Sequence, residues 1–163
     1  MNRRRAQTLI FVGSIVLAFL LQLTPLPQSM LPYKPYWIAL VLIYWAIEAP
    51  DRVGLGFAFI IGLCGDLLTG QLLGEQALRL IVLAFIVLRF RSRLRFFPMS
   101  QQALAVLGLM LNDRIVVIMV RGFSGDPVPA IGFWISPFIG MLAWPFVFLL
   151  LDDIRARLRA TES

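Results

Sequence analysis

The chain has 163 residues, of which 60% are hydrophobic and 15% charged, and its formal net charge is +6. Its apolar residues form long runs separated by charges. This pattern is typical of a multi-pass membrane protein and leaves no soluble basic face for nucleic acid. Because the chain has no histidine and one cysteine, Ser-His-Asp triads, His-based zinc sites and intrachain disulfides are excluded. We therefore expect no cofactor and no enzyme activity.

The apolar runs predict an all-α integral membrane protein with about six transmembrane helices in a single polytopic domain, residues 1–163. The predicted spans are residues 8–23, 36–49, 53–70, 71–90, 103–120 and 130–151. Several of them are shorter than the roughly 20 residues of a comfortable span, and tilting accommodates this shortfall.

The first run follows Arg3, Arg4 and Arg5. It lacks a small-x-small cleavage site, so we expect a retained helix rather than a signal peptide. The proline-rich stretch between residues 25 and 35 then predicts a loop.

Polar residues interrupt the later runs. We expect a basic loop after the fourth run and an interruption of the fifth run at residues 112–114. Pro137 and Pro145 lie within the sixth run, where we expect them to kink or interrupt the helix. The arginines of the expected basic loop are Arg89, Arg91, Arg93 and Arg95.

The basic residues are distributed unequally between the two sides that these spans define. Eleven lie at the termini, at Arg52 and in the basic loop, whereas three (Lys34, Arg79 and Arg121) lie on the other side. The positive-inside rule therefore predicts that both termini are cytoplasmic. The same charges attract anionic membrane lipids. We interpret the tryptophans as anchors at the membrane interface: Trp37, Trp45, Trp134 and Trp144.

Small residues recur every four positions in the third run, and one carboxylate interrupts them. Residues at this spacing share a helix face, and small residues let helices approach closely in lipid. Two interpretations stay open, namely packing within the chain and docking of another membrane protein. The stripe comprises Gly54, Ala58, Gly62, Asp66 and Gly70, and Gly74 continues its spacing.

Charged residues within apolar runs are costly and need partners. Counted from the predicted span ends, Asp66, Arg79 and Asp113 lie in the same half of the membrane, and Arg114 adjoins Asp113. We hypothesise that these four residues form a charge-balanced cluster, whose role is structural pairing or a ligand or proton site. Arg79 snorkelling to the interface is the alternative. Two adjacent arginines would keep both carboxylates ionised, which disfavours a catalytic dyad.

Three groups of residues along the chain form a recognisable set. The central group is Gly62-x-x-x-Asp66-Leu67-x-x-Gly70-x-x-x-Gly74-x-x-Ala77-Leu78. The others are Pro35-x-Trp37 with Tyr44-Trp45, and Phe133-Trp134 followed by Trp144-Pro145. Together they resemble the rod shape-determining protein MreD family of Gram-negative bacteria.

The resemblance implies a non-enzymatic inner-membrane subunit of the cell-elongation machinery that supports peptidoglycan synthesis. Members of this family work beside MreC, MreB, the glycosyltransferase RodA and its class B penicillin-binding partner. The resemblance also implies a fold similar to the substrate-binding subunits of energy-coupling-factor transporters. A small-molecule or lipid-binding subunit is therefore the alternative function.

Overall fold

The computed structural model describes residues 3–25, 27–70, 73–125 and 131–161. These residues form helices and no strand, as the sequence predicts. The α-helices are α1 (Arg3–Leu23), α2 (Trp37–Glu48), α3 (Leu55–Thr69), α4 (Glu75–Phe96), α5 (Met99–Phe123) and α6 (Ile135–Thr161). Short 3-10 helices, η1 (Gln28–Tyr33) and η2 (Ile131–Trp134), precede α2 and α6. The proline-rich stretch thus contains η1 rather than a loop alone.

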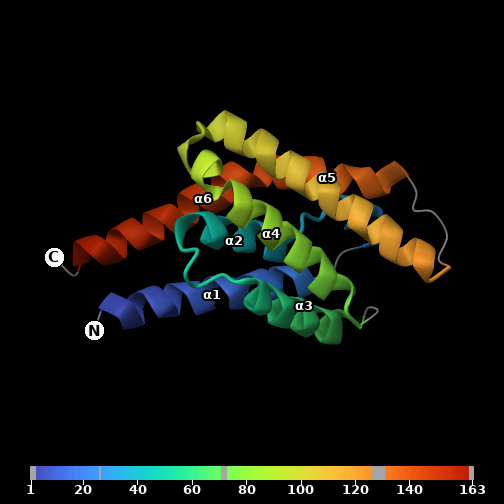
Figure 1. Cartoon of the computed structure of the whole chain (residues 1–163), viewed down its shortest axis with the longest axis horizontal. Coiled ribbons are helices and arrows are strands. Elements are labelled where there is room, and N and C mark those ends of the chain that lie inside the picture. Colours follow the sequence, from blue (N-terminus) through green and yellow to red (C-terminus); the bar gives the residue numbers. More distant parts are fainter. Residues whose placement is uncertain (1–2, 26, 71–72, 126–130, 162–163) are drawn as a thin grey trace.

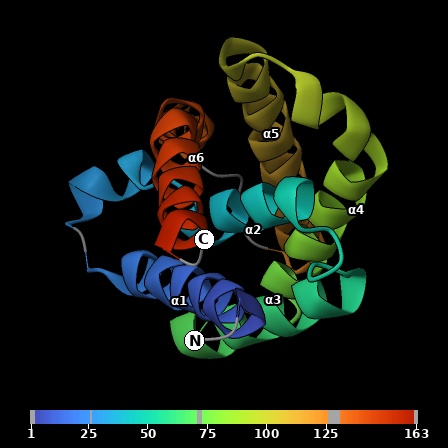
Figure 2. The ribbon, with the colours of Figure 1, turned by 90° about the vertical axis from the view of Figure 1, so that its left-hand side faces the viewer.

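The short helix α2 forms the core of the bundle. Every residue from Ile38 to Ile47 is buried. Helices α1, α4 and α6 pack around it, as Figure 2 shows. A helix that is apolar on all sides is stable only when other elements surround it. This central position explains how a run of 12 residues forms a stable helix although it is too short for a comfortable span.

The outer helices present apolar side chains to their surroundings. In the described part of the chain, α1, α5 and α6 are long and apolar enough to cross a membrane, and α2 and α3 are shorter apolar helices. Leu20 is 60% exposed and Phe146 is 77% exposed. Such surfaces suit hydrocarbon rather than water, and helices satisfy their backbone hydrogen bonds internally. The chain is therefore a membrane protein.

The predicted basic loop after the fourth run and the predicted interruption of the fifth run are both wrong. Helix α4 continues to Phe96, so the arginines that we placed in a basic loop are helical. Arginine is a good helix former, and the chain leaves the helix only just before Pro98. Arg91 also donates from Nε to the carbonyl oxygen of Ile47 at 2.7 Å. Residues 112–114 likewise lie inside the uninterrupted helix α5.

The two ends of the bundle differ in what they contain. Both termini, the α2–α3 connection and the α4–α5 connection lie at one end (Figure 1). We call this the terminal end. The helices η1 and η2 and the α3–α4 turn lie at the opposite end. Successive connections therefore lie at alternate ends of the bundle, as the predicted spans require.

The tryptophans do not all occupy interface positions. Trp144 is fully buried, and its Nε1–H points to Oε1 of Gln102 at 3.4 Å. Trp45 is also buried and donates to Oγ of Ser14 at 2.8 Å. Interface anchoring is therefore the wrong interpretation for Trp45 and Trp144, because both indoles find hydrogen-bond partners in the core. Trp37 and Trp134 are half-buried near the ends of α2 and η2.

The two prolines of the sixth run do not interrupt α6. Pro137 lies in its first turn, where a backbone N–H has no helical partner in any case. Pro145 lies inside α6, and the helix continues past it to Thr161. The predicted interruption is therefore wrong at both positions, and the kink stays a prediction.

Candidate functional site

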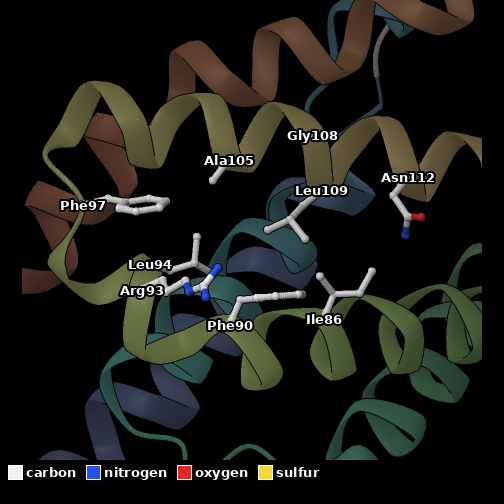
Figure 3. A pocket seen from close by; sticks show the side chains of 9 residues that line it. All are labelled: Ile86, Phe90, Arg93, Leu94, Phe97, Ala105, Gly108, Leu109 and Asn112. Carbon is white, nitrogen blue, oxygen red and sulfur yellow. The ribbon is translucent and has the colours of Figure 1, made fainter.

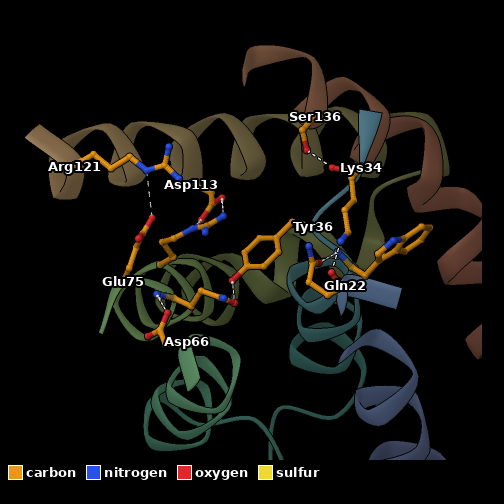
Figure 4. Close-up of polar contacts among 11 residues, drawn as sticks. Gln22, Lys34, Tyr36, Asp66, Glu75, Asp113, Arg121 and Ser136 are labelled. Carbon is orange, nitrogen blue, oxygen red and sulfur yellow. Dashed lines mark hydrogen bonds and ion pairs between the residues drawn. The ribbon is translucent and has the colours of Figure 1, made fainter. Parts of the chain in front are cut away.

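A polar cavity of about 160 Å³ opens at the end of the bundle opposite the termini. It lies where α1 and α3 end, where α2 and α4 begin, and beside the last half of α5 (Figure 4). Its lining is rich in cationic and amide side chains: Gln22, Lys34, Pro35, Tyr36, Thr69, Gln76, Arg79, Arg114, Val117 and Arg121.

An ion pair between α4 and α5 forms the floor of this cavity. Arg79 donates from Nε to Oδ1 of Asp113 and from Nη2 to Oδ2, each at 2.8 Å. The guanidinium also lies over the ring of Tyr36, 4.3 Å from its centroid. Both charged side chains are buried, at 9% and 2% exposed. A bidentate pair of this kind fixes how the two helices face each other.

Asp66 lies apart from this ion pair. Its carboxylate accepts the backbone N–H of Gly74 at 2.8 Å and that of Gln76 at 2.9 Å. These donors belong to the start of α4, where unpaired N–H groups and the helix dipole favour a negative charge. Asp66 therefore caps α4 across the α3–α4 turn. It does not belong to the four-residue charge cluster that we predicted from depth.

Replacing Asp66 by alanine is expected to lower the free energy of unfolding by about 1–2 kcal/mol, because the backbone N–H groups of Gly74 and Gln76 lose their acceptor. Unfolding in detergent micelles measures this change. Asp153→Ala is the control, since that exposed carboxylate pairs with Arg157 at the terminal end and is expected to change stability by less than about 0.5 kcal/mol. Equal losses for the two variants would contradict the capping role.

The small-residue stripe packs against α4 within the chain. Ala58, Gly62 and Asp66 are buried, and α3 contacts α4 along this face. A Cβ atom at Gly62 would lie 2.3 Å from Cα of Ala77, so only glycine fits there. Gly65, which the sequence analysis did not single out, lies close to the end of the Gln76 side chain, which is flexible, rather than to backbone atoms.

The remaining glycines of the stripe have a different position. Gly54 precedes α3, whereas Gly70 follows it with a φ of 69°. Gly74 precedes α4 with a φ of 98°. Left-handed backbone favours glycine, so Gly70 and Gly74 shape the α3–α4 turn. The predicted single face of six residues is therefore a buried centre flanked by helix ends.

The other cations of the cavity have weaker partners than Arg79. Arg114 lies over the ring of Phe133, 4.4 Å from its centroid. Arg121 places Nε 3.7 Å from a carboxylate oxygen of Glu75. Among the described residues, the lining contains four cations (Lys34, Arg79, Arg114 and Arg121) and no carboxylate, while Asp113 and Glu75 pair with two of these arginines, so the lining carries an excess of positive charge. The predicted cluster of Asp66, Arg79, Asp113 and Arg114 is divided, because Asp66 caps α4 and Arg114 lies over Phe133.

Polar side chains at the loop side of the cavity were not identified from the sequence. Tyr36 donates its hydroxyl hydrogen to Oε1 of Gln76 at 3.0 Å. Lys34 donates to the carbonyl oxygens of Gln22 and Thr24, and partial burial lowers the pKa of its ammonium. The available signal was a set of polar residues next to predicted span ends, which we interpreted only as boundaries.

The lining of the cavity is suited to binding, because it presents four cationic side chains: Lys34, Arg79, Arg114 and Arg121. No three His, Cys, Asp or Glu side chains in the described ranges are grouped so as to hold a metal ion. The guanidinium groups of Arg114 and Arg121 border a small space and suit an anionic or carbonyl-rich segment.

Comparison with known proteins assigns the family. The family model described as rod shape-determining protein MreD matches residues 2–154. The chain belongs to the MreD family. The rod shape-determining protein MreD of Haemophilus influenzae is 33% identical over 156 residues, which cover 94% of each chain. This confirms the resemblance drawn from the sequence and supports a role in determining rod shape.

No solved structure matches the chain. The likeness to energy-coupling-factor transporter subunits therefore stays a prediction. The central group of residues behind the MreD resemblance nevertheless has a clear place in this structure. Gly62, Asp66, Gly74 and Ala77 build the junction of α3 and α4 beside the polar cavity.

Proposed function

We propose that the chain is a non-enzymatic inner-membrane subunit of the bacterial cell-elongation complex and that it binds MreC directly. MreB, RodA and a class B penicillin-binding protein belong to the wider complex in this proposal. Through MreC the chain supports peptidoglycan synthesis and maintains rod shape. Family membership supports the cellular role, and the polar cavity supports a binding role.

Both termini lie in the cytoplasm in this proposal. The four arginines at the end of α4, the three at each terminus and Arg52 all belong to elements that meet at the terminal end. Such clustering favours the side from which positive charges do not cross the membrane. The polar cavity then opens toward the periplasm.

The excess of positive charge in the cavity is the observation that carries the proposed contact with MreC. Arg114 and Arg121 line the cavity, and neither belongs to the buried ion pair of Arg79 and Asp113. In this proposal, the segment of MreC next to its transmembrane helix enters the polar cavity. Carboxylate or carbonyl oxygens of that segment accept hydrogen bonds from the guanidinium groups of Arg114 and Arg121. The remaining lining residues set the depth and shape of the contact.

The test is capture of MreC from membranes with the tagged chain as wild type, Arg114→Gln and Arg121→Gln. A hydrogen bond to a charged group contributes about 1.5–3 kcal/mol, so each variant is expected to capture MreC about tenfold more weakly or worse. Arg157→Gln is the matched control, because this arginine is 80% exposed at the terminal end. Unchanged capture by both cavity variants, with normal membrane insertion, would count against the proposal.

A small-molecule or lipid-binding role of the transporter type remains the second candidate. The volume of the cavity, about 160 Å³, is enough for a small polar group. Mass spectrometry of extracts from the purified chain distinguishes the two roles. A compound that co-purifies with the wild type and is lost in Arg114→Gln, while MreC capture is unchanged, would favour this second role.

A further inference from the structure

A second cavity, of about 360 Å³, forms a groove between α4 and α5. Figure 3 shows the side chains from both helices that face this space. The groove lies on the terminal side of the molecule, away from the polar cavity. It is lined by Ile86, Phe90, Arg93, Leu94, Phe97, Ala105, Gly108, Leu109 and Asn112.

The groove is apolar except at its two ends. The Arg93 side chain reaches the space between Phe90 and Leu94, whereas Asn112 lies at the other end (Figure 3). The buried Nδ2 atom of Asn112 has no hydrogen-bond partner in the part of the chain that the structure describes. Arg93 and the apolar side chains of the lining fit a hydrocarbon chain that carries a negative charge at the Arg93 end.

The charged residues between positions 77 and 112, a range that includes the whole lining of the groove, are all arginines. Arg89, Arg91, Arg93 and Arg95 fall within a few residues of each other, and the sequence contains no acidic residue between positions 76 and 112. Arg91 donates a hydrogen bond to a backbone carbonyl of α2, whereas Arg93 faces the groove. Basic pockets between transmembrane helices on the cytoplasmic side attract anionic lipid headgroups.

The lined part of the groove is shorter than one leaflet. Seven residues separate Ile86 from Arg93 on α4 and Ala105 from Asn112 on α5, which correspond to about 10 Å of helix. One leaflet contributes about half of the 30 Å hydrocarbon core, or about 15 Å. A chain that enters beside Arg93 therefore follows the groove through about two thirds of a leaflet before it reaches Asn112.

We propose that this groove binds an acyl chain of an anionic phospholipid, with the headgroup phosphate held by Arg93. Gly108 leaves room for the chain, because a Cβ atom there would meet no other atom within 4 Å. The lipid covers the apolar faces of α4 and α5, and its site is separate from the polar cavity.

The test uses the purified full-length chain in detergent micelles. Native mass spectrometry measures the binding of phosphatidylglycerol and of phosphatidylcholine with the same acyl chains. Phosphatidylglycerol is expected to bind more tightly. Arg93→Gln is expected to weaken it about fivefold, the effect of one basic residue near anionic lipid. Gly108→Leu fills the groove and is expected to weaken binding of both lipids.

Two control variants make the outcome specific. Arg95→Gln removes the same charge two residues away but does not line the groove, so its effect is expected to be smaller than that of Arg93→Gln. Asn112→Leu replaces an unpaired donor by an apolar side chain and is expected to retain the lipid. Unchanged binding in Arg93→Gln or Gly108→Leu, or equal binding of the two lipids, overturns the proposal. The proposal is also overturned if the wild type carries a bound second copy of the chain or another polypeptide that Gly108→Leu no longer binds.

Discussion

Asp113→Asn is expected to lower the free energy of unfolding by about 3–5 kcal/mol. The substitution leaves the Arg79 guanidinium buried without its counter-charge, and an unpaired buried charge costs more than the pair itself contributes. The new amide keeps one acceptor oxygen, but its NH2 group faces the second guanidinium N–H, and the ring of Tyr36 over the guanidinium does not replace the lost negative charge. Unfolding in micelles, followed by circular dichroism against denaturant, measures the loss.

A double-mutant cycle separates the ion pair from general disruption of the site. The variant with Arg79→Gln and Asp113→Asn together carries two neutral amides and no buried charge. It is expected to be more stable than either single variant, because neither partner is then left as an unpaired ion. Additive losses would show that the two residues act independently, which contradicts the bidentate geometry.

Depth along the helices placed Arg79 and Asp113 in one cluster, but it indicated neither that these two residues pair with each other nor the role of Asp66. Arg79 and Asp113 lie at similar depth on adjacent helices, and oppositely charged side chains within a membrane tend to pair. Asp66 lies in the same half of the membrane, but depth does not say which face of α3 it occupies. The start of α4 supplies free backbone N–H groups closer to it than any arginine. Backbone donors leave no signal in a hydropathy pattern.

The apolar runs predicted the helices correctly and their ends poorly. Composition determines where a helix is stable in lipid, but arginines at the end of α4 continue a helix as well as apolar residues do. The burial of α2 also had a sequence signal, since its residues are apolar on every side. We interpreted this segment as a short span, because its neighbours in space are not evident from the order of the chain.

The general preference of tryptophan for membrane interfaces does not predict the position of each tryptophan in this chain. Tryptophan is frequent at membrane interfaces, and this tendency describes the half-buried Trp37. Trp144 instead fills the core because Gln102 of α5 supplies an acceptor within reach of its Nε1–H. The acceptor is 42 residues away in the sequence, so no local pattern reveals it.

Gly62→Ala is expected to lower the free energy of unfolding by about 1–3 kcal/mol, as overpacking of a filled interior does. The added methyl group would lie 2.3 Å from Cα and 2.4 Å from the backbone nitrogen of Ala77. These are backbone atoms, so α3 and α4 must separate to accommodate it. In an open helical position the same substitution raises stability by roughly 0.5–1 kcal/mol, so the sign of the change reports the close approach.

Two further variants test this interpretation of Gly62. Gly56→Ala places the same methyl group on α3 where no atom lies within 4 Å, and it is expected to be neutral or mildly stabilising. Ala77→Gly is not expected to rescue Gly62→Ala, because the colliding atoms belong to the backbone and remain. Since Asp66 caps α4 only while the two helices are in contact, Asp66→Ala should cost less in the Gly62→Ala background than in the wild type. Rescue by Ala77→Gly, or equal costs of Asp66→Ala in both backgrounds, would contradict the α3–α4 geometry.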